Sequence, residues 1–139
     1  MTAYGAEPDL RRRLESLREP VRLVFFTQTF GCDDCLPARQ AIDRIAALSD
    51  RVTVEEHNLV LERDRAAEYG IDRAPALAVV GAREAGIRYY GVPAGYEVES
   101  VVDGIEIAAG GGPTLTDESL AALATLDRSV RIQVFVTPT

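Results

Sequence analysis

Two cysteines stand close together in the stretch TFGCDDCLPAR, and they are the only cysteines among 139 residues. Cys32 and Cys35 are separated by two aspartates. A pair at this spacing can be a dithiol that exchanges electrons, one half of a metal site, or a coincidence of composition. The residues around the pair decide which chemistry the sequence favours.

The cysteine pair is predicted to lie at the start of a helix. A continuous apolar run, VRLVFFT at 21–27, precedes it and is typical of a strand buried on both faces. After it, apolar residues recur at helical spacing at Ala38, Ala41, Ile42, Ile45 and Leu48. The N-terminal end of a helix favours a thiolate, which is the nucleophilic form of cysteine. The outer cysteine would therefore attack a disulfide, and the deeper one would resolve the product.

Two other interpretations of the pair remain open. The cysteines could be small buried apolar residues, although a junction between strand and helix argues against this. A structural metal site needs four ligands, and the chain offers one histidine and no second CxxC, so a metal would have to be shared between two subunits. We expect His57, within a predicted strand, to be a surface residue rather than a catalytic base.

Composition limits the other function classes. The net charge of −7 and the pI of about 4.7 disfavour nucleic acid and anionic membranes as partners. The N-terminus lacks the pattern of a signal peptide, and no run of apolar residues is long enough to span a membrane. A close cysteine pair is typical of proteins in the reducing cytoplasm, which we therefore expect as the location. All fifteen basic residues are arginine, so chemistry based on lysine is excluded.

The order of predicted elements indicates an α/β fold. Apolar periodicity and turn residues predict a helix capped by Asp9, strands at 21–27, 51–58, 76–81 and 86–91, and helices beginning near 35, 62 and 95. Strands that alternate with helices imply a parallel core, and the two adjacent strands add an antiparallel edge. We therefore predict a central mixed four-stranded sheet flanked by helices.

The end of the chain repeats its beginning. VRIQVFVTP from Val130 matches VRLVFFTQT from Val21, 109 positions earlier, and each follows a short amphipathic helix. Similar buried strands can arise by chance. The repeat otherwise indicates a first domain at 1–109, a linker at 110–116, and a helix and strand at 117–139 that begin a second unit.

The CxxC pair, the proline loop and the element order resemble the thioredoxin/glutaredoxin superfamily. The segments YGIDRAPA, GIRYYGVPAGYE and VRIQVFVTPT resemble, more narrowly, protein disulfide oxidoreductases built from two thioredoxin-fold units. The resemblance implies a thioredoxin-like fold and a dithiol–disulfide oxidoreductase. A weaker resemblance, to the N-terminal redox domain of alkyl hydroperoxide reductase flavoproteins, implies an electron-transfer domain of a peroxide-reducing system.

The resemblance also implies roles for individual residues. Cys32 would be the nucleophile and Cys35 the resolving thiol. Pro75 would be a cis proline, with Ala74 and Gly91 bordering a groove for substrate peptide.

Two positions depart from the thioredoxin pattern. Gly31, also placed at the substrate groove, stands where thioredoxins carry Trp, and Phe26 stands where they carry a buried Asp. Glu55 or Glu56 of the second predicted strand could relay protons or could both be solvated, and the sequence does not choose between them.

The expected activity is reduction or isomerisation of protein disulfides without a bound cofactor or metal. Electrons would come from a donor that resembles thioredoxin reductase. The alternative is a docking or scaffold unit without catalytic activity. If the strand at 130–136 is left unpaired, it could add to an edge of its own first unit or pair with the same strand of a second copy, and we expect the second outcome, a homodimer.

Overall fold

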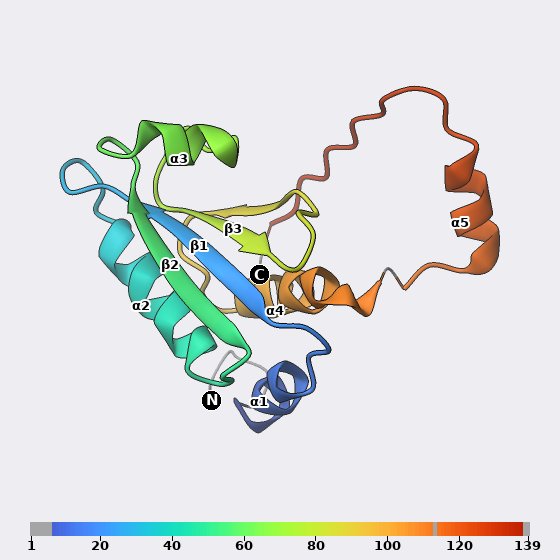
Figure 1. Ribbon diagram of the computed structural model, residues 1–139, viewed down its shortest axis with the longest axis horizontal. Helices are drawn as coiled ribbons and strands as arrows, with labels where there is room; N and C mark the ends of the chain where they lie inside the picture. The colour runs from blue at the N-terminus through green and yellow to red at the C-terminus, as the bar shows by residue number, and fades with distance from the viewer. Residues whose placement is uncertain (1–6, 113, 138–139) are drawn as a thin grey trace.

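A computed structural model describes residues 7–112 and 114–137 of the chain. Its elements, in chain order, are α1 (Glu7–Glu15), β1 (Val21–Thr27), α2 (Cys35–Ala46), β2 (Val52–Asn58), α3 (Arg63–Glu68), β3 (Ala76–Val80), β4 (Ile87–Tyr90), α4 (Glu97–Glu106), a π-helical turn (Ile107–Gly111) and α5 (Asp117–Ala124). Figure 1 shows the strands as one sheet with helices on both faces. The predicted α/β class is confirmed.

The sheet has the order β2-β1-β3-β4. β1 runs parallel to β2 and antiparallel to β3, and β3 runs antiparallel to β4. The predicted mixed sheet of four strands is therefore confirmed. β1 is one of the two inner strands and has neighbours on both sides, which explains why it is apolar from Leu23 to Phe26, whereas Arg22 is exposed and pairs with Glu55.

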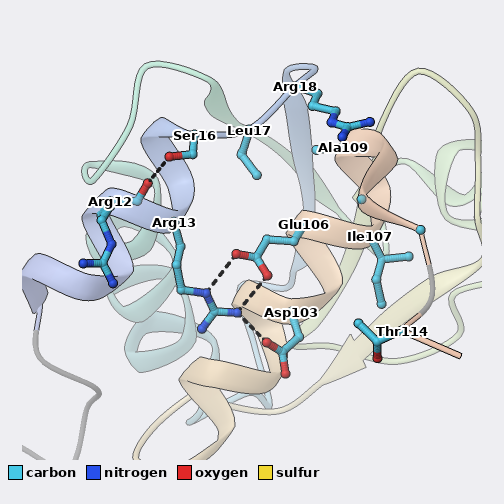
Figure 2. A pocket seen from close by; sticks show the side chains of 12 residues that line it. Arg12, Arg13, Ser16, Leu17, Arg18, Asp103, Glu106, Ile107, Ala109 and Thr114 are labelled. Atoms are coloured by element: carbon cyan, nitrogen blue, oxygen red, sulfur yellow. Dashed lines mark hydrogen bonds and ion pairs between the residues drawn. The ribbon is translucent and has the colours of Figure 1, made fainter.

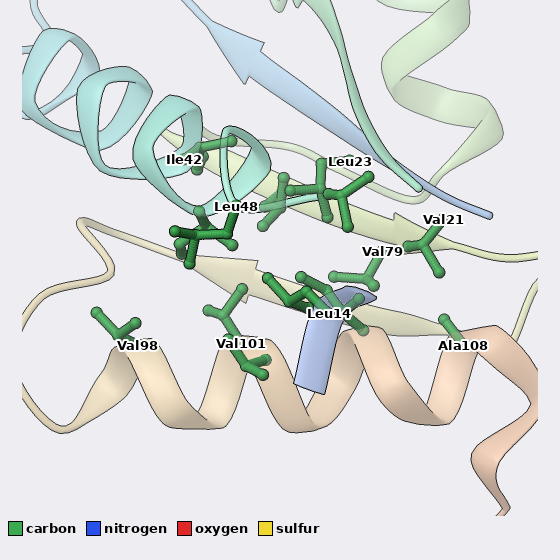
Figure 3. Packing of buried hydrophobic residues seen from close by; sticks show 14 of the residues in the cluster. Leu14, Val21, Leu23, Ile42, Leu48, Val79, Val98, Val101 and Ala108 are labelled. Carbon is green, nitrogen blue, oxygen red and sulfur yellow. The ribbon is translucent and has the colours of Figure 1, made fainter. Parts of the chain in front are cut away.

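Alternating residues of β1 face the two sides of the sheet. Leu23 and Phe25 lie in the larger core cluster, with residues of α1, α2 and α4. Figure 3 shows this packing, with Leu14 of α1 and Val101 of α4 beneath the sheet. Val24 and Phe26 lie in the smaller cluster on the opposite face, which α3 covers through Ala66. The period of two along a strand accounts for this division.

One helix boundary differs from the sequence prediction. α1 begins at Glu7, so Asp9 lies inside its first turn, where it pairs with Arg12, and does not cap the helix. At the other end of the domain, helical backbone continues from α4 to Ala109, and Gly110, with a φ of 89°, interrupts it where the predicted linker begins. Ala108 and Ala109 are buried there. A side chain at Gly81 would meet the Ala108 carbonyl oxygen at 1.8 Å, so only glycine allows this close approach.

The C-terminal segment differs from the rest of the chain. α5 forms as predicted, and the Thr116 hydroxyl accepts a hydrogen bond from the Ser119 N–H at its start. Residues 130–137 form no strand, and every residue of 114–137 is exposed. The predicted strand at 130–136 is therefore wrong for the described chain, because no other strand lies beside it to accept its hydrogen bonds. Figure 1 shows α5 apart from the sheet and its helices.

None of the helices that the structure describes combines the length and the apolar character needed to cross a membrane.

Candidate active site: a disulfide at the start of α2

Cys32 and Cys35 are joined by a disulfide, with their Cα atoms 5.4 Å apart. Cys35 is the first residue of α2, and Cys32 lies in the loop that follows β1. Cys32 is partly exposed, whereas Cys35 is only 5% exposed. No side chain caps the N-terminus of α2, although Asp34 occupies the cap position. The positive end of the helix dipole therefore acts on the cysteine pair, where it favours a thiolate once the disulfide is reduced.

Side-chain hydrogen bonds hold the loop between β1 and the disulfide. The Gln28 side-chain amide donates to the carbonyl oxygens of Phe30, at 2.8 Å, and Gly31, at 3.3 Å. The Asn58 side chain donates to Thr29 across the loops that follow β1 and β2. Sequence reasoning missed Gln28 and Asn58. Asn58 carries a signal that could have been used, since asparagine at the end of a strand commonly forms a turn with its side chain, as here by accepting from the Val60 and Leu61 N–H groups.

The proline loop lies at the same edge of the sheet as the disulfide. The register pairs Phe26 of β1 with Ala76 of β3, directly after Pro75, and Ala76 with Tyr90, directly before Gly91. The Ala74–Pro75 peptide bond is cis. The Gly91 N–H donates to the Pro75 carbonyl oxygen at 3.1 Å. The fold therefore brings Ala74, Pro75 and Gly91 together at the end of the sheet where the chain leaves β1 for the disulfide.

The two candidate proton-relay residues lie on opposite faces of the sheet. Glu56 lies on the face that α2 covers and accepts a hydrogen bond from Arg39 of α2 at 2.7 Å. Arg39 is one turn along α2 from Cys35, and it also pairs with Asp43. Glu55 lies on the other face, in register with Val24.

Glu55 is held by three basic side chains. His57 contacts its carboxylate at 2.5 Å, Arg65 at 2.7 Å and Arg22 at 2.8 Å. These hydrogen bonds, with that of His57 first, lower the pKa of Glu55 to about 2. A carboxyl group with such a low pKa remains ionised throughout the neutral range. Glu55 is therefore poorly suited to carry a proton.

His57 is not the surface residue that the sequence suggested. Its side chain is 12% exposed and its ring lies 5.6 Å from that of Phe26, centroid to centroid. The ring nitrogens contact Glu55 and Glu62, both of them carboxylates that only accept hydrogen bonds. Burial lowers the pKa of His57, but the hydrogen bonds with Glu62 and Glu55 outweigh it and raise the pKa overall. Through these contacts His57 links β2 to Glu62 in the loop before α3.

A hollow of about 690 Å³ lies between α1 and α4, near the start of β1 and thus at the end of the sheet opposite to the disulfide. Figure 2 shows Arg13 of α1 directed at Glu106 and Asp103 of α4. The Arg13 guanidinium donates two hydrogen bonds to Glu106, at 2.8 and 2.9 Å, and one to Asp103. These contacts tie α1 to α4, and the hollow takes no part in the chemistry of the cysteines.

Among the residues that the structure describes, no group of three or more His, Cys, Asp and Glu side chains is arranged to hold a metal ion.

No protein-family model matches the chain. The chain is similar to two proteins described as probable thioredoxins. It is 30% identical over 88 residues to that of Methanothermobacter marburgensis, a match that covers 62% of this chain and 98% of the relative. It is 31% identical over 85 residues to that of Methanothermobacter thermautotrophicus, covering 60% of this chain and 93% of the relative.

Solved structures share the fold. The N-terminal domain of the alkylhydroperoxide reductase AhpF from Enterococcus faecalis matches with a TM-score of 0.73 at 24% identity, over 81% of this chain and 55% of that chain. A protein disulfide oxidoreductase from Aeropyrum pernix matches with a TM-score of 0.73 at 21% identity, over 91% of this chain and 56% of that chain. The chain therefore spans little more than half the length of these two structures.

The two kinds of likeness agree with the geometry of the site. The thioredoxin relatives are matched over nearly their whole length, and the solved structures share the mixed sheet flanked by helices. The disulfide lies at the start of α2, the helix that follows the inner strand β1. The chain belongs to the thioredoxin family and is a thiol–disulfide oxidoreductase.

Proposed function

We propose that the chain exchanges electrons with disulfides of other proteins, and that Cys32 makes the first attack. The observation that carries this assignment is the unequal exposure of the two sulfur-bearing residues. Cys32 is partly exposed in the loop before α2, whereas Cys35 is buried at its first turn. An incoming disulfide can reach only the more exposed cysteine without disturbing the helix.

The reaction proceeds in two exchanges. The Cys32 thiolate attacks one sulfur of the substrate disulfide, the substrate S–S bond breaks, and one substrate cysteine leaves as a thiolate that takes up a proton. The Cys35 thiol then loses its proton and attacks the Cys32 sulfur, which releases the second substrate thiol and forms the Cys32–Cys35 disulfide. Two electrons pass to the substrate, and a dithiol donor of the thioredoxin-reductase kind returns them in a reducing cytoplasm.

We propose that a groove for the substrate peptide is formed by Gly31, Ala74, Pro75 and Gly91. Within the described residues, the backbone N–H and C=O groups of Ala74 have no hydrogen-bond partner. An extended substrate segment can pair with such free groups as an added strand would. Because Gly31 has no side chain and directly precedes Cys32, it leaves the approach to the sulfur open.

Glu56 is our proposed proton relay for Cys35, because it lies on the face of α2 and Glu55 does not. Glu56→Gln should slow the attack of Cys35 on the mixed disulfide and alter the pH profile of that step, as measured by quenched-flow experiments. Glu55→Gln is the matched control. Equal effects of the two substitutions would remove Glu56 from the mechanism.

The proposed activity is tested by turbidity measurements of insulin reduction with dithiothreitol as donor. The wild-type chain should accelerate precipitation of the insulin B chain, and Cys32→Ser should abolish the acceleration. A docking or scaffold unit would give the rate of dithiothreitol alone for both proteins, and that result would contradict the proposal.

A second candidate role is suggested by the likeness to the N-terminal domain of an alkylhydroperoxide reductase. In this role the chain passes electrons to a peroxide-reducing partner. Peroxide consumption by a peroxidase supplied with the reduced chain tests it. If peroxide is consumed no faster with the reduced chain than with Cys32→Ser, the role is excluded.

We also propose that residues 117–139 begin a second thioredoxin-like unit, after a linker at 110–116 that follows a first domain at 1–109. The repeat of VRLVFFT as VRIQVFV and the exposure of residues 130–137 support this division. In isolation, the segment 130–136 would pair with its copy in a homodimer.

Removal of residues 114–139 tests both parts of this proposal. The shortened chain should remain folded and active, since Cys32, Cys35 and Pro75 all precede the deletion, and light scattering should give a dimer mass for the full chain only. A shortened chain that unfolds would place the segment in the core of the first domain. A full chain that is monomeric would exclude the dimer.

A further inference from the structure

We propose that Asp33 and Asp34 make the site selective for disulfides that carry positive charge beside the attacked sulfur. This inference rests on the proposed function and names the substrate class of the same site. Both aspartates are exposed, and neither forms an ion pair within the described part of the chain. Two uncompensated carboxylates therefore lie between the reactive cysteines.

Their distance from the sulfur atoms is limited by the covalent chain. Asp33 directly follows Cys32, and neighbouring Cα atoms are about 3.8 Å apart. The reach of the two short side chains keeps the Asp33 carboxylate within roughly 9 Å of the Cys32 sulfur. The Debye length is about 30 Å at 0.01 M salt and about 8 Å at 0.15 M, so a charge on the substrate next to its disulfide interacts with Asp33 almost unscreened at low salt and is partly screened at 0.15 M.

The neighbouring arginines do not cancel this charge. Arg39, in the second turn of α2, is occupied by Asp43 and Glu56. Arg73, two residues before Pro75, lies over the Tyr90 ring at 4.5 Å and has Asp72 beside it at 3.9 Å, so that pair of opposite charges is neutral overall. The net charge at the rim of the disulfide remains negative.

Two exposed apolar side chains flank the acidic pair. Phe30 is 87% exposed in the loop before Cys32, and Leu36 is exposed directly after Cys35. Exposed apolar groups beside a reactive centre add binding area without selecting for charge. The surface around the sulfurs therefore fits a basic segment that also carries apolar residues.

Small disulfides of similar size vary the charge beside the attacked sulfur. The probes are cystamine, which is cationic, 3,3′-dithiodipropionate, which is anionic, and 2-hydroxyethyl disulfide, which is neutral. The protein is reduced, freed of reductant, and mixed with each probe, and the second-order rate constant is measured. Each rate constant is divided by that of the same probe with 2-mercaptoethanol, which removes differences in leaving-group pKa, and all comparisons use these relative rate constants. Cystamine should then react roughly tenfold faster than the anionic probe at low ionic strength, and roughly two- to threefold faster at 0.15 M salt.

The double variant Asp33→Asn with Asp34→Asn tests whether these two carboxylates cause the preference for cationic disulfides. Its ratio of cationic to anionic rate constants should fall to about one. Because the ratio compares two probes on the same thiolate, it is unaffected by any change in the reactivity of Cys32. The matched control is Asp50→Asn with Glu15→Gln, two exposed acids at the opposite end of the sheet, which should leave the ratio unchanged.

The possible outcomes separate the two claims. Wild-type rate constants that are equal for the three probes would overturn the charge selection and leave the proposed function intact. A ratio that persists in the Asp33→Asn, Asp34→Asn variant, or that falls equally in the control, would also overturn it. No reaction with any probe would overturn the proposed function, and the selectivity with it.

Discussion

β1 and the segment 130–136 share a sequence pattern and differ completely in their surroundings. Phe26 of β1 is 0% exposed, and Phe135, at the matching position of the repeat, is 89% exposed. β1 is paired on both sides, by β2 and β3, and helices cover both of its faces. The segment 130–136 has neither neighbouring strands nor covering helices among the described residues.

The contrast shows that an apolar run forms a strand only where neighbouring strands pair with its backbone and other elements bury its side chains. A lone strand leaves its N–H and C=O groups to water and its apolar side chains exposed. The same seven-residue pattern is therefore a central strand at one end of the chain and extended backbone at the other.

The matched phenylalanines give the largest expected difference. Phe26→Ala should lower the free energy of unfolding by about 3 to 5 kcal/mol, because it removes a fully buried ring from the smaller core cluster. In the monomeric chain, at concentrations below any dimerisation, Phe135→Ala should change it by less than about 0.5 kcal/mol, as expected of an exposed side chain. Urea denaturation followed by circular dichroism measures both. A comparable loss in the two variants would show that residues 130–136 pack as tightly as β1.

An intermediate effect is expected from Glu55, which ties β1, β2 and α3 together. Its pKa is lowered to about 2 in the folded chain from an ordinary value of 4.5. Its ion pairs therefore stabilise the fold above about pH 4.5, and this stabilisation is lost as the pH falls toward 2.

Glu55→Gln should lower the free energy of unfolding at pH 7 by on the order of 1 kcal/mol, since the side chain is partly exposed. The difference between wild type and variant should vanish near pH 2. Unfolding curves at several pH values give this difference, and removal of residues 114–139 should leave it unchanged. A difference that grows as the pH falls would contradict the assignment.

The smallest effect is expected at the cap of α5. Thr116→Ala removes the acceptor for the Ser119 N–H, which costs about 1 kcal/mol of local helix stability. Because α5 is exposed along its whole length, global unfolding should not change. Amide hydrogen exchange should become several-fold faster at Leu120, whose N–H donates to Thr116, and Thr116→Ser should keep the wild-type rate. A lower melting temperature of the whole protein would show that α5 supports the core.

Local patterns predicted the elements that hold the cysteines. The apolar run of β1 and the helical spacing after Cys35 were sufficient to place the pair at the start of α2. These features depend on residues close together in sequence, where periodicity and helix signals act.

Contacts between distant residues could not be predicted in the same way. Nothing near Arg13 indicates that it would pair with Glu106 of α4, 93 positions later, and nothing near His57 indicates that its ring would lie beside that of Phe26. Alternation along β2 places Glu55 and Glu56 on opposite faces of the sheet, but only the register of β2 with β1 shows that Glu56 lies on the face of α2.

Mixed-disulfide trapping tests the central claim most directly, namely that the exposed Cys32 attacks and the buried Cys35 resolves. Reduced full-length Cys35→Ser and Cys32→Ser proteins are mixed with insulin, quenched with acid, and analysed by mass spectrometry of the digested adducts. The account predicts a stable adduct through Cys32 in Cys35→Ser and little or none in Cys32→Ser. An adduct that forms readily through Cys35 in Cys32→Ser, with none through Cys32 in Cys35→Ser, would contradict it.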